Sequence, residues 1–251
     1  MKEWVKAPRL PICLMAGVLT IVSFKLVNRT HEAFLPALAV FAIACATMVQ
    51  NDWRDRFHDI NKGKTLALRQ PLRFQLFLYA AWISAVAVCL MLFQVDYRQG
   101  AICALMMVSG LLYSEARRIP MLPLITVAVT SASPVLLAMF GQENKASQIT
   151  LFVLIFGTIL GREIIKDLMD REIDFGYKWT LPVVVGNYFS KAVVINLAVL
   201  FMIPGVLFLG SPISVPLIFA ACFFLAWKRQ YLIARTAIDI AIVCALITTL
   251  I

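Results

Sequence analysis

Acidic residues are scarce in this 251-residue chain, which has 14 Asp and Glu against 23 Lys and Arg. Charged residues make up only 15% of the sequence, whereas hydrophobic residues make up 61%. Soluble domains are usually about 45–50% apolar, so this balance argues against a soluble domain and is typical of a membrane protein. The mean hydropathy of +0.86 agrees with that interpretation.

Other features are also missing. The six cysteines form no C-x-x-C pair, and all lie within apolar stretches (Cys13, Cys45, Cys89, Cys103, Cys222 and Cys244). We therefore expect small packing residues rather than disulfides or metal ligands. The sequence has no long linker or low-complexity tract, and no cleavable signal peptide is apparent. A single membrane domain over residues 1–251 is the simplest interpretation.

Long apolar stretches dominate the chain. A transmembrane helix needs about 20 mostly apolar residues. Nine stretches are candidates: 9–27, 32–50, 72–94, 99–114, 120–140, 147–166, 189–209, 211–227 and 232–251. Lipid leaves backbone groups no partner outside the helix, and strands of a membrane barrel would alternate in hydrophobicity. The sequence therefore predicts an all-α integral membrane protein, a bundle of about nine transmembrane helices around a central cavity.

The basic residues are distributed unevenly between alternate loops. If these nine stretches span the membrane, 19 of the 23 Lys and Arg lie on one side, and only Lys25, Arg29, Arg98 and Lys145 lie on the other. The positive-inside rule then places the N-terminus on the cytoplasmic face of a multi-pass protein, which we expect in the cell membrane. This topology accounts for the net charge of +9 without a nucleic-acid partner.

Eight of the 14 acidic residues fall in two short segments, residues 51–59 and 162–174, which follow or overlap the second and sixth apolar stretches. The basic-residue distribution puts both segments on the cytoplasmic side. Acidic residues are costly near a bilayer, and crowded carboxylates repel one another unless a cation compensates. Mg²⁺, held partly by carboxylates and partly by substrate phosphates, fits this pattern best.

The spacing in both segments places oxygens on one helix face. If the helices continue through them, Asn51, Asp55 and Asp59 recur at i, i+4 and i+8. The corresponding residues of the second segment, Asp167, Asp170 and Asp174, recur at i, i+3 and i+7. Glycines 63 and 176 follow the two segments and allow the chain to turn. The four-helix offset between the segments indicates two related units, helices 1–4 and 5–8, followed by a ninth helix.

Two facing carboxylate clusters can bind two Mg²⁺ ions bridged by a diphosphate. Lys and Arg side chains near them would hold phosphate oxygens, and the candidates are Lys178, Arg117, Arg118, Arg162 and Lys166. An apolar cavity between the helices would hold a hydrocarbon tail. For the basic residues outside the acidic segments, a role in topology or lipid contact is nearly as good an explanation.

The two segments resemble motifs of the UbiA superfamily of intramembrane prenyltransferases. Asn51-Asp52-x-x-Asp55-x-x-x-Asp59 is similar to the first motif of that family, and the second segment to its second motif. The stretch 162–167 resembles most closely the branch that contains digeranylgeranylglyceryl phosphate synthases.

The resemblance implies an enzyme that uses Mg²⁺ to transfer a prenyl group from a polyprenyl diphosphate donor to a hydrophobic acceptor, a lipid or an aromatic compound. It also implies functional residues. One Mg²⁺ would be bound by Asn51, Asp55 and Asp59, the other by Asp167, Asp170 and Asp174, with Asp55, Asp170 and Asp174 essential for catalysis.

Residues 62–71 depart from the pattern of many relatives, which have an Arg-Pro pair and then a Ser-Gly pair there. Because that loop lies near the acceptor end in such proteins, the difference bears on the acceptor. An intramembrane terpene cyclase, which would ionise the same donor without an acceptor, therefore stays open as an alternative. A non-enzymatic cation or lipid transporter is disfavoured, because it predicts acids at the membrane midplane rather than at helix ends.

Overall fold

The computed structural model describes residues 4, 7–115, 119, 121–140, 142, 145–191, 193 and 228–250. These residues form α-helices and short 3-10 helices and, within those ranges, no strand. The predicted helices 189–209 and 211–227 lie almost entirely outside the described residues. The chain divides into two compact units, Met1–Glu115 and Ala116–Ile251, each of which has its own packing.

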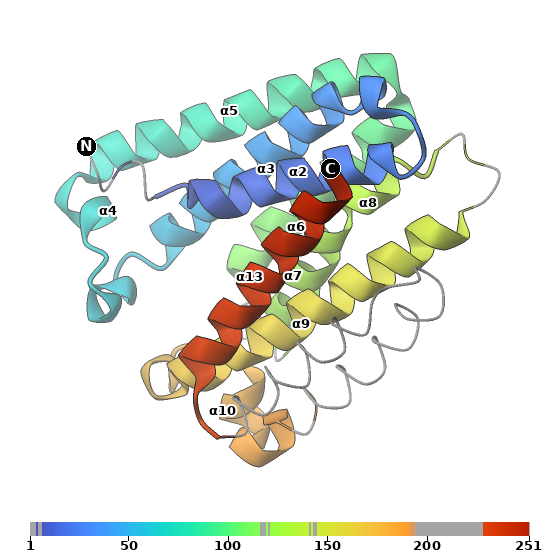
Figure 1. Ribbon diagram of the computed structural model, residues 1–251. Helices are drawn as coiled ribbons and strands as arrows, with labels where there is room; N and C mark the ends of the chain where they lie inside the picture. The colour runs from blue at the N-terminus through green and yellow to red at the C-terminus, as the bar shows by residue number, and fades with distance from the viewer. Residues whose placement is uncertain are drawn as a thin grey trace. The chain divides into compact units, whose positions relative to one another are not determined.

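The first unit follows the predicted helices closely. Its elements are α2 (Leu10–Lys25), η1 (Thr30–Glu32), α3 (Phe34–Arg54), η2 (Asp59–Lys62), α4 (Leu66–Arg69), α5 (Pro71–Val95) and α6 (Tyr97–Glu115). α3 contacts α2, α5 and α6, so it is the central helix of this unit (Figure 1). Gly110 of α6 lies so close to α3 that a Cβ atom would overlap the Thr47 hydroxyl oxygen. Small residues at helix contacts allow this kind of close approach in membranes.

The second unit departs from the predictions at two places. Its elements are α7 (Leu122–Ala132), α8 (Pro134–Leu137), α9 (Ala146–Asp174), α10 (Leu181–Val185) and α13 (Tyr231–Leu250). The helix predicted over 120–140 is interrupted at Ser133, because Pro134 has no N–H to continue the ladder and its ring obstructs the preceding turn. The helix predicted over 147–166 instead runs on to Asp174, through the whole acidic segment.

α9 is the central helix of the second unit. It contacts α7, α8, α10 and α13, and α13 runs along it (Figure 1). The core of this unit consists of apolar side chains from these helices: Leu124, Ala128, Leu160, Ile164, Ile165, Leu168, Leu181, Ala234 and Ile238. In each unit, therefore, the helix on which the others pack is the one that leads into an acidic segment.

Within the part of the chain that the structure describes, three helices are long and apolar enough to cross a membrane: α3, α5 and α9. α5 carries a continuous exposed apolar face at alternating spacings of four and three residues: Leu72, Leu76, Tyr79, Ile83, Val86, Leu90 and Phe93. Water does not solvate such a face, whereas lipid chains do. The chain is an integral membrane protein, and this stripe is suited to face lipid.

An aromatic cluster packs around Trp53, which belongs to the first acidic segment. The ring of Phe74 on α5 lies 6.0 Å from that of Trp53 on α3, and Trp4 lies 6.0 Å from Phe74 and 5.7 Å from Phe77. Val49, one turn before Trp53, is fully buried in the same cluster. Aromatic packing of this kind fixes the last turn of α3 and hence the start of the acidic segment.

Candidate metal–diphosphate site

The first acidic segment keeps helical spacing beyond the end of α3. Although α3 ends at Arg54, the Asp55 N–H donates to the Asn51 carbonyl (2.8 Å) and the Asp59 N–H donates to the Asp55 carbonyl (2.8 Å). The three residues are 8%, 2% and 4% exposed, whereas Arg54, Phe57 and Ile60 are exposed. Asn51, Asp55 and Asp59 thus share one buried face, at the spacing expected from the sequence.

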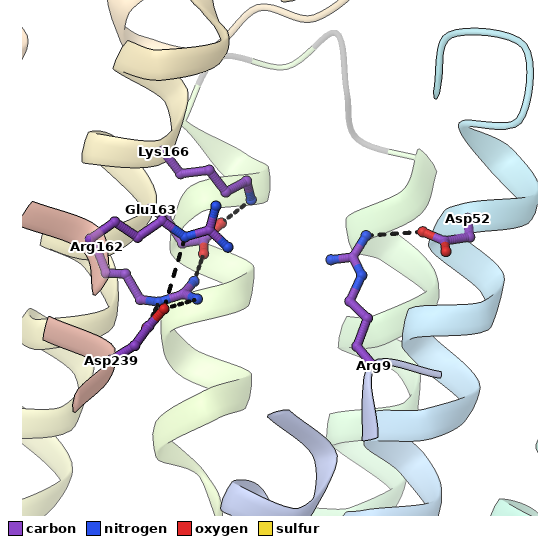
Figure 2. Close-up of polar contacts among 7 residues, drawn as sticks. Arg9, Asp52, Arg162, Glu163, Lys166 and Asp239 are labelled. Atoms are coloured by element: carbon purple, nitrogen blue, oxygen red, sulfur yellow. Dashed lines mark hydrogen bonds and ion pairs between the residues drawn. The ribbon is translucent and has the colours of Figure 1, made fainter. Parts of the chain in front are cut away.

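Asp52 lies off this face and has cationic partners of its own. Arg9, at the start of α2, donates from Nη2 to Asp52 Oδ1 at 2.9 Å (Figure 2). Lys64 Nζ lies 3.0 Å from Asp52 Oδ1 and 2.8 Å from Asp59 Oδ2. Lys64 was missed in the sequence analysis, because its position five residues after Asp59 is the one feature that marks it.

The second acidic segment forms the last turns of α9. Asp167 and Asp170 are half-buried and Asp174, the final residue of the helix, is buried. The Asp174 carbonyl accepts hydrogen bonds from the N–H groups of Tyr177 (3.0 Å) and Lys178 (2.9 Å). Gly176, with φ of 79°, makes this turn possible, as Gly63 with φ of 75° does after the first segment. The backbone of Lys178 is therefore held one turn beyond Asp174.

Two of the basic residues predicted to meet phosphate take part in an ion-pair network within the second unit. Arg162 on α9 donates from Nε to Asp239 Oδ1 on α13 (2.5 Å) and from Nη2 to Oδ2 (3.2 Å). It also donates from Nη1 to Glu163 Oε1 (2.6 Å), and Lys166 pairs with the other oxygen of Glu163 (Figure 2). This arrangement ties α13 to α9 a few turns before Asp174.

The remaining two predicted phosphate contacts, Arg117 and Arg118, lie outside the described residues. Just before them, Glu115 at the end of α6 pairs with Arg54 at the end of α3, with Arg54 Nη2 2.5 Å from Glu115 Oε1. This pair fixes the end of α6 next to the first acidic segment.

Both acidic segments stand at the C-terminal ends of helices. The aligned peptide dipoles leave partial negative charge at that end, so carboxylates there are unfavourable unless a cation is bound nearby. The donors on the predicted faces are carboxylate and amide oxygens, which suit Mg²⁺. Among the described residues, no three or more His, Cys, Asp or Glu side chains converge as a complete metal site.

Comparison with known proteins settles the family. The sequence matches the UbiA prenyltransferase family over residues 10–247. The chain belongs to this family. A search of curated proteins finds no match to it.

Solved UbiA structures share the fold of the chain. A UbiA homolog from Aeropyrum pernix K1 in its apo form is 17% identical, with a TM-score of 0.75 over 96% of this chain and 99% of that one. A digeranylgeranylglyceryl phosphate synthase is 19% identical, with a TM-score of 0.65 over 99% and 94%. A UbiA homolog from Archaeoglobus fulgidus bound to GPP and Mg²⁺ is 15% identical, with a TM-score of 0.68 over 98% and 97%.

Proposed function

We propose that this chain catalyses the Mg²⁺-dependent transfer of a prenyl group from a polyprenyl diphosphate to a hydrophobic acceptor, a lipid or an aromatic compound, within the membrane. The observation that carries the proposal is the pair of oxygen-bearing faces at the C-terminal ends of α3 and α9, the central helices of their units. Membership of the family supports prenyl transfer. The relative with GPP and Mg²⁺ bound supports the donor class and the metal.

Each face would hold one Mg²⁺ ion through its oxygens. The proposed ligands are Asn51, Asp55 and Asp59 on the first face, and Asp167, Asp170 and Asp174 on the second. Of these, Asp55, Asp170 and Asp174 are the proposed catalytic residues. Bound Mg²⁺ would neutralise the diphosphate and act on it as a Lewis acid.

The basic residues would bind the diphosphate oxygens. Lys178 is well placed for this role because its backbone is fixed one turn after Asp174. Arg117 and Arg118 are proposed for the same role from the segment after α6. Arg162 and Lys166 are proposed to contribute positive charge from within their network with Glu163 and Asp239.

In the reaction, the bond between the prenyl carbon and the diphosphate oxygen breaks, and its electron pair leaves with the diphosphate. A nucleophilic atom of the acceptor forms the new bond to the prenyl carbon and loses a proton. A dry apolar cavity would protect the reacting carbon from water. We propose that this cavity lies at the centre of a bundle of about nine helices.

We also propose that residues 1–251 form one domain built from two four-helix repeats and a ninth helix. The division of the chain after Glu115, between the predicted fourth and fifth helices, supports two repeats. The distribution of Lys and Arg supports a cytoplasmic N-terminus and cytoplasmic acidic segments in the cell membrane.

The test is pyrophosphate release by the detergent-purified protein from a series of prenyl diphosphates, with and without Mg²⁺ and with and without a membrane lipid extract. We expect release that requires both Mg²⁺ and the extract, and a prenylated product that identifies the acceptor. Release with Mg²⁺ alone and a cyclised product would identify a cyclase. No release from any donor would refute the proposal.

A further inference from the structure

Lys64 lies beside two carboxylates of the first acidic segment. Its ammonium nitrogen lies 2.8 Å from Asp59 Oδ2 and 3.0 Å from Asp52 Oδ1. The backbone N–H of Lys64 donates to the Asp59 carbonyl at 3.0 Å, across the turn that Gly63 makes with positive φ. The base of the side chain is therefore fixed beside Asp59, and the ammonium group is at hydrogen-bond distance from both carboxylates.

The two cations that contact Asp52 differ in how freely they can move. Arg9 belongs to the turn that starts α2, its side chain is 32% exposed, and it gives Asp52 a planar guanidinium. The Lys64 side chain is 43% exposed, whereas the Asp59 side chain is 5% exposed. A half-exposed ammonium on a flexible stem can withdraw into water at little cost, but a buried carboxylate cannot follow it. When Lys64 withdraws, Asp52 still has Arg9.

We propose that Lys64 is an exchangeable counter-ion of the first acidic segment: its ammonium group occupies Asp59 while no divalent cation is bound and leaves Asp59 when one binds. This inference rests on the proposed function, because it takes Asp59 as a ligand of the first Mg²⁺ site. It makes Lys64 a positioning residue, whose ammonium group holds the Asp59 carboxylate at hydrogen-bond distance until the metal ion binds.

The proposed exchange makes a prediction about the strength of metal binding. A divalent cation must displace the ammonium group to reach Asp59, so Lys64 competes with the metal ion. Removing the Lys64 charge should therefore tighten metal binding, whereas damage to the site would weaken it. The Lys64–Asp59 ion pair is partly exposed, so displacing it should cost the metal ion little free energy. We therefore expect the neutral Lys64 variants to bind the metal ion about fivefold more tightly, or by about 1 kcal/mol.

The experiment measures Mn²⁺ binding directly, by equilibrium dialysis of the full-length protein in detergent, with and without inorganic pyrophosphate. The variants are Lys64→Met and the milder Lys64→Gln, and Lys64→Arg keeps the charge. Arg73→Met is the matched control, because Arg73 is an exposed cation of the same unit whose Nη1 donates to the Gln70 side-chain oxygen at 3.5 Å.

We expect tighter Mn²⁺ binding by Lys64→Met and Lys64→Gln, and wild-type binding by Lys64→Arg and Arg73→Met. Unchanged or weaker binding by both neutral Lys64 variants would overturn the inference while leaving the proposed function intact. An equal gain with Arg73→Met would show a general charge effect and overturn it too. Failure of the wild-type protein to bind Mn²⁺, with or without pyrophosphate, would instead refute the proposed metal site itself.

Discussion

The bond between Arg162 and Asp239 offers a sharp test of how the second unit is held together. The two residues lie 77 positions apart in the sequence and join α9 to α13 through two parallel hydrogen bonds. In Asp239→Ala, Arg162 keeps Glu163 but loses the acceptor for Nε and Nη2. The Arg162 side chain is 12% exposed, so little solvent reaches it to replace that acceptor.

Removing one partner of a buried ion pair costs about 3–5 kcal/mol. The Asp239 side chain is 36% exposed, so we discount that figure to about 2 kcal/mol. For a chain of this size, such a loss lowers the unfolding midpoint by about 4–8 °C. The assay is thermal unfolding of the detergent-purified protein, followed by the intrinsic fluorescence of its five tryptophans.

A double variant shows whether Asp239→Ala destabilises the protein by leaving a buried charge unpaired or by removing packing contacts. Arg162→Met combined with Asp239→Leu removes both charges and fills their space, and Glu163 still has Lys166. Replacing a buried pair by apolar residues is often neutral or stabilising, so this variant should recover most of the lost stability. Arg235 Nε lies 4.0 Å from Asp239 Oδ2, beyond hydrogen-bond distance, so Arg235→Met should have little effect. A single variant as stable as wild type, or a double variant no better than the single, would refute this reasoning.

Two further predictions concern the proposed site and the packing behind it. Asp55→Asn and Asp174→Asn should each reduce Mg²⁺-dependent pyrophosphate release at least about 100-fold while the protein stays folded, because each removes a charged metal ligand. The control, Glu172→Gln, changes an exposed position of α9 and should keep activity. Full activity in both Asn variants would contradict the assignment of the metal ligands. Gly110→Ala should destabilise the first unit by about 1–2 kcal/mol, since the new Cβ would overlap the Thr47 side chain, and Thr47→Ala should restore part of that loss in a thermal unfolding assay.

Helix positions in the first unit could be predicted because each long apolar run ends in a polar residue or proline. The prediction 72–94 agrees closely with α5, which starts at Pro71 and stops before Asp96. The break in the second unit was missed because apolar residues continue on both sides of Ser133, so hydropathy alone hides the effect of Pro134. α9 was predicted too short for the opposite reason: its charged last turns no longer look like a membrane span.

The oxygen-bearing faces could be predicted because residue spacing along a helix fixes which side chains share a face. Contacts between residues that are distant in the sequence could not be predicted in this way. Nothing in the sequence links Arg162 to Asp239, or Arg9 to Asp52, since these pairs depend on how helices pack against each other. Arg162 and Lys166 were predicted as phosphate contacts from charge alone, but charge does not reveal that Glu163 and Asp239 lie within reach.

The length of α9 couples its acidic end to the thickness of the bilayer. Its 29 residues extend about 43 Å, whereas the hydrocarbon core of a typical membrane is about 30 Å thick. If Ala146 marks one boundary of that core, about nine residues protrude from the other, and these include Asp167, Asp170 and Asp174. A thicker membrane would draw Asp167 into the hydrocarbon first, so the lipid composition of the host membrane would tune the charge of this site.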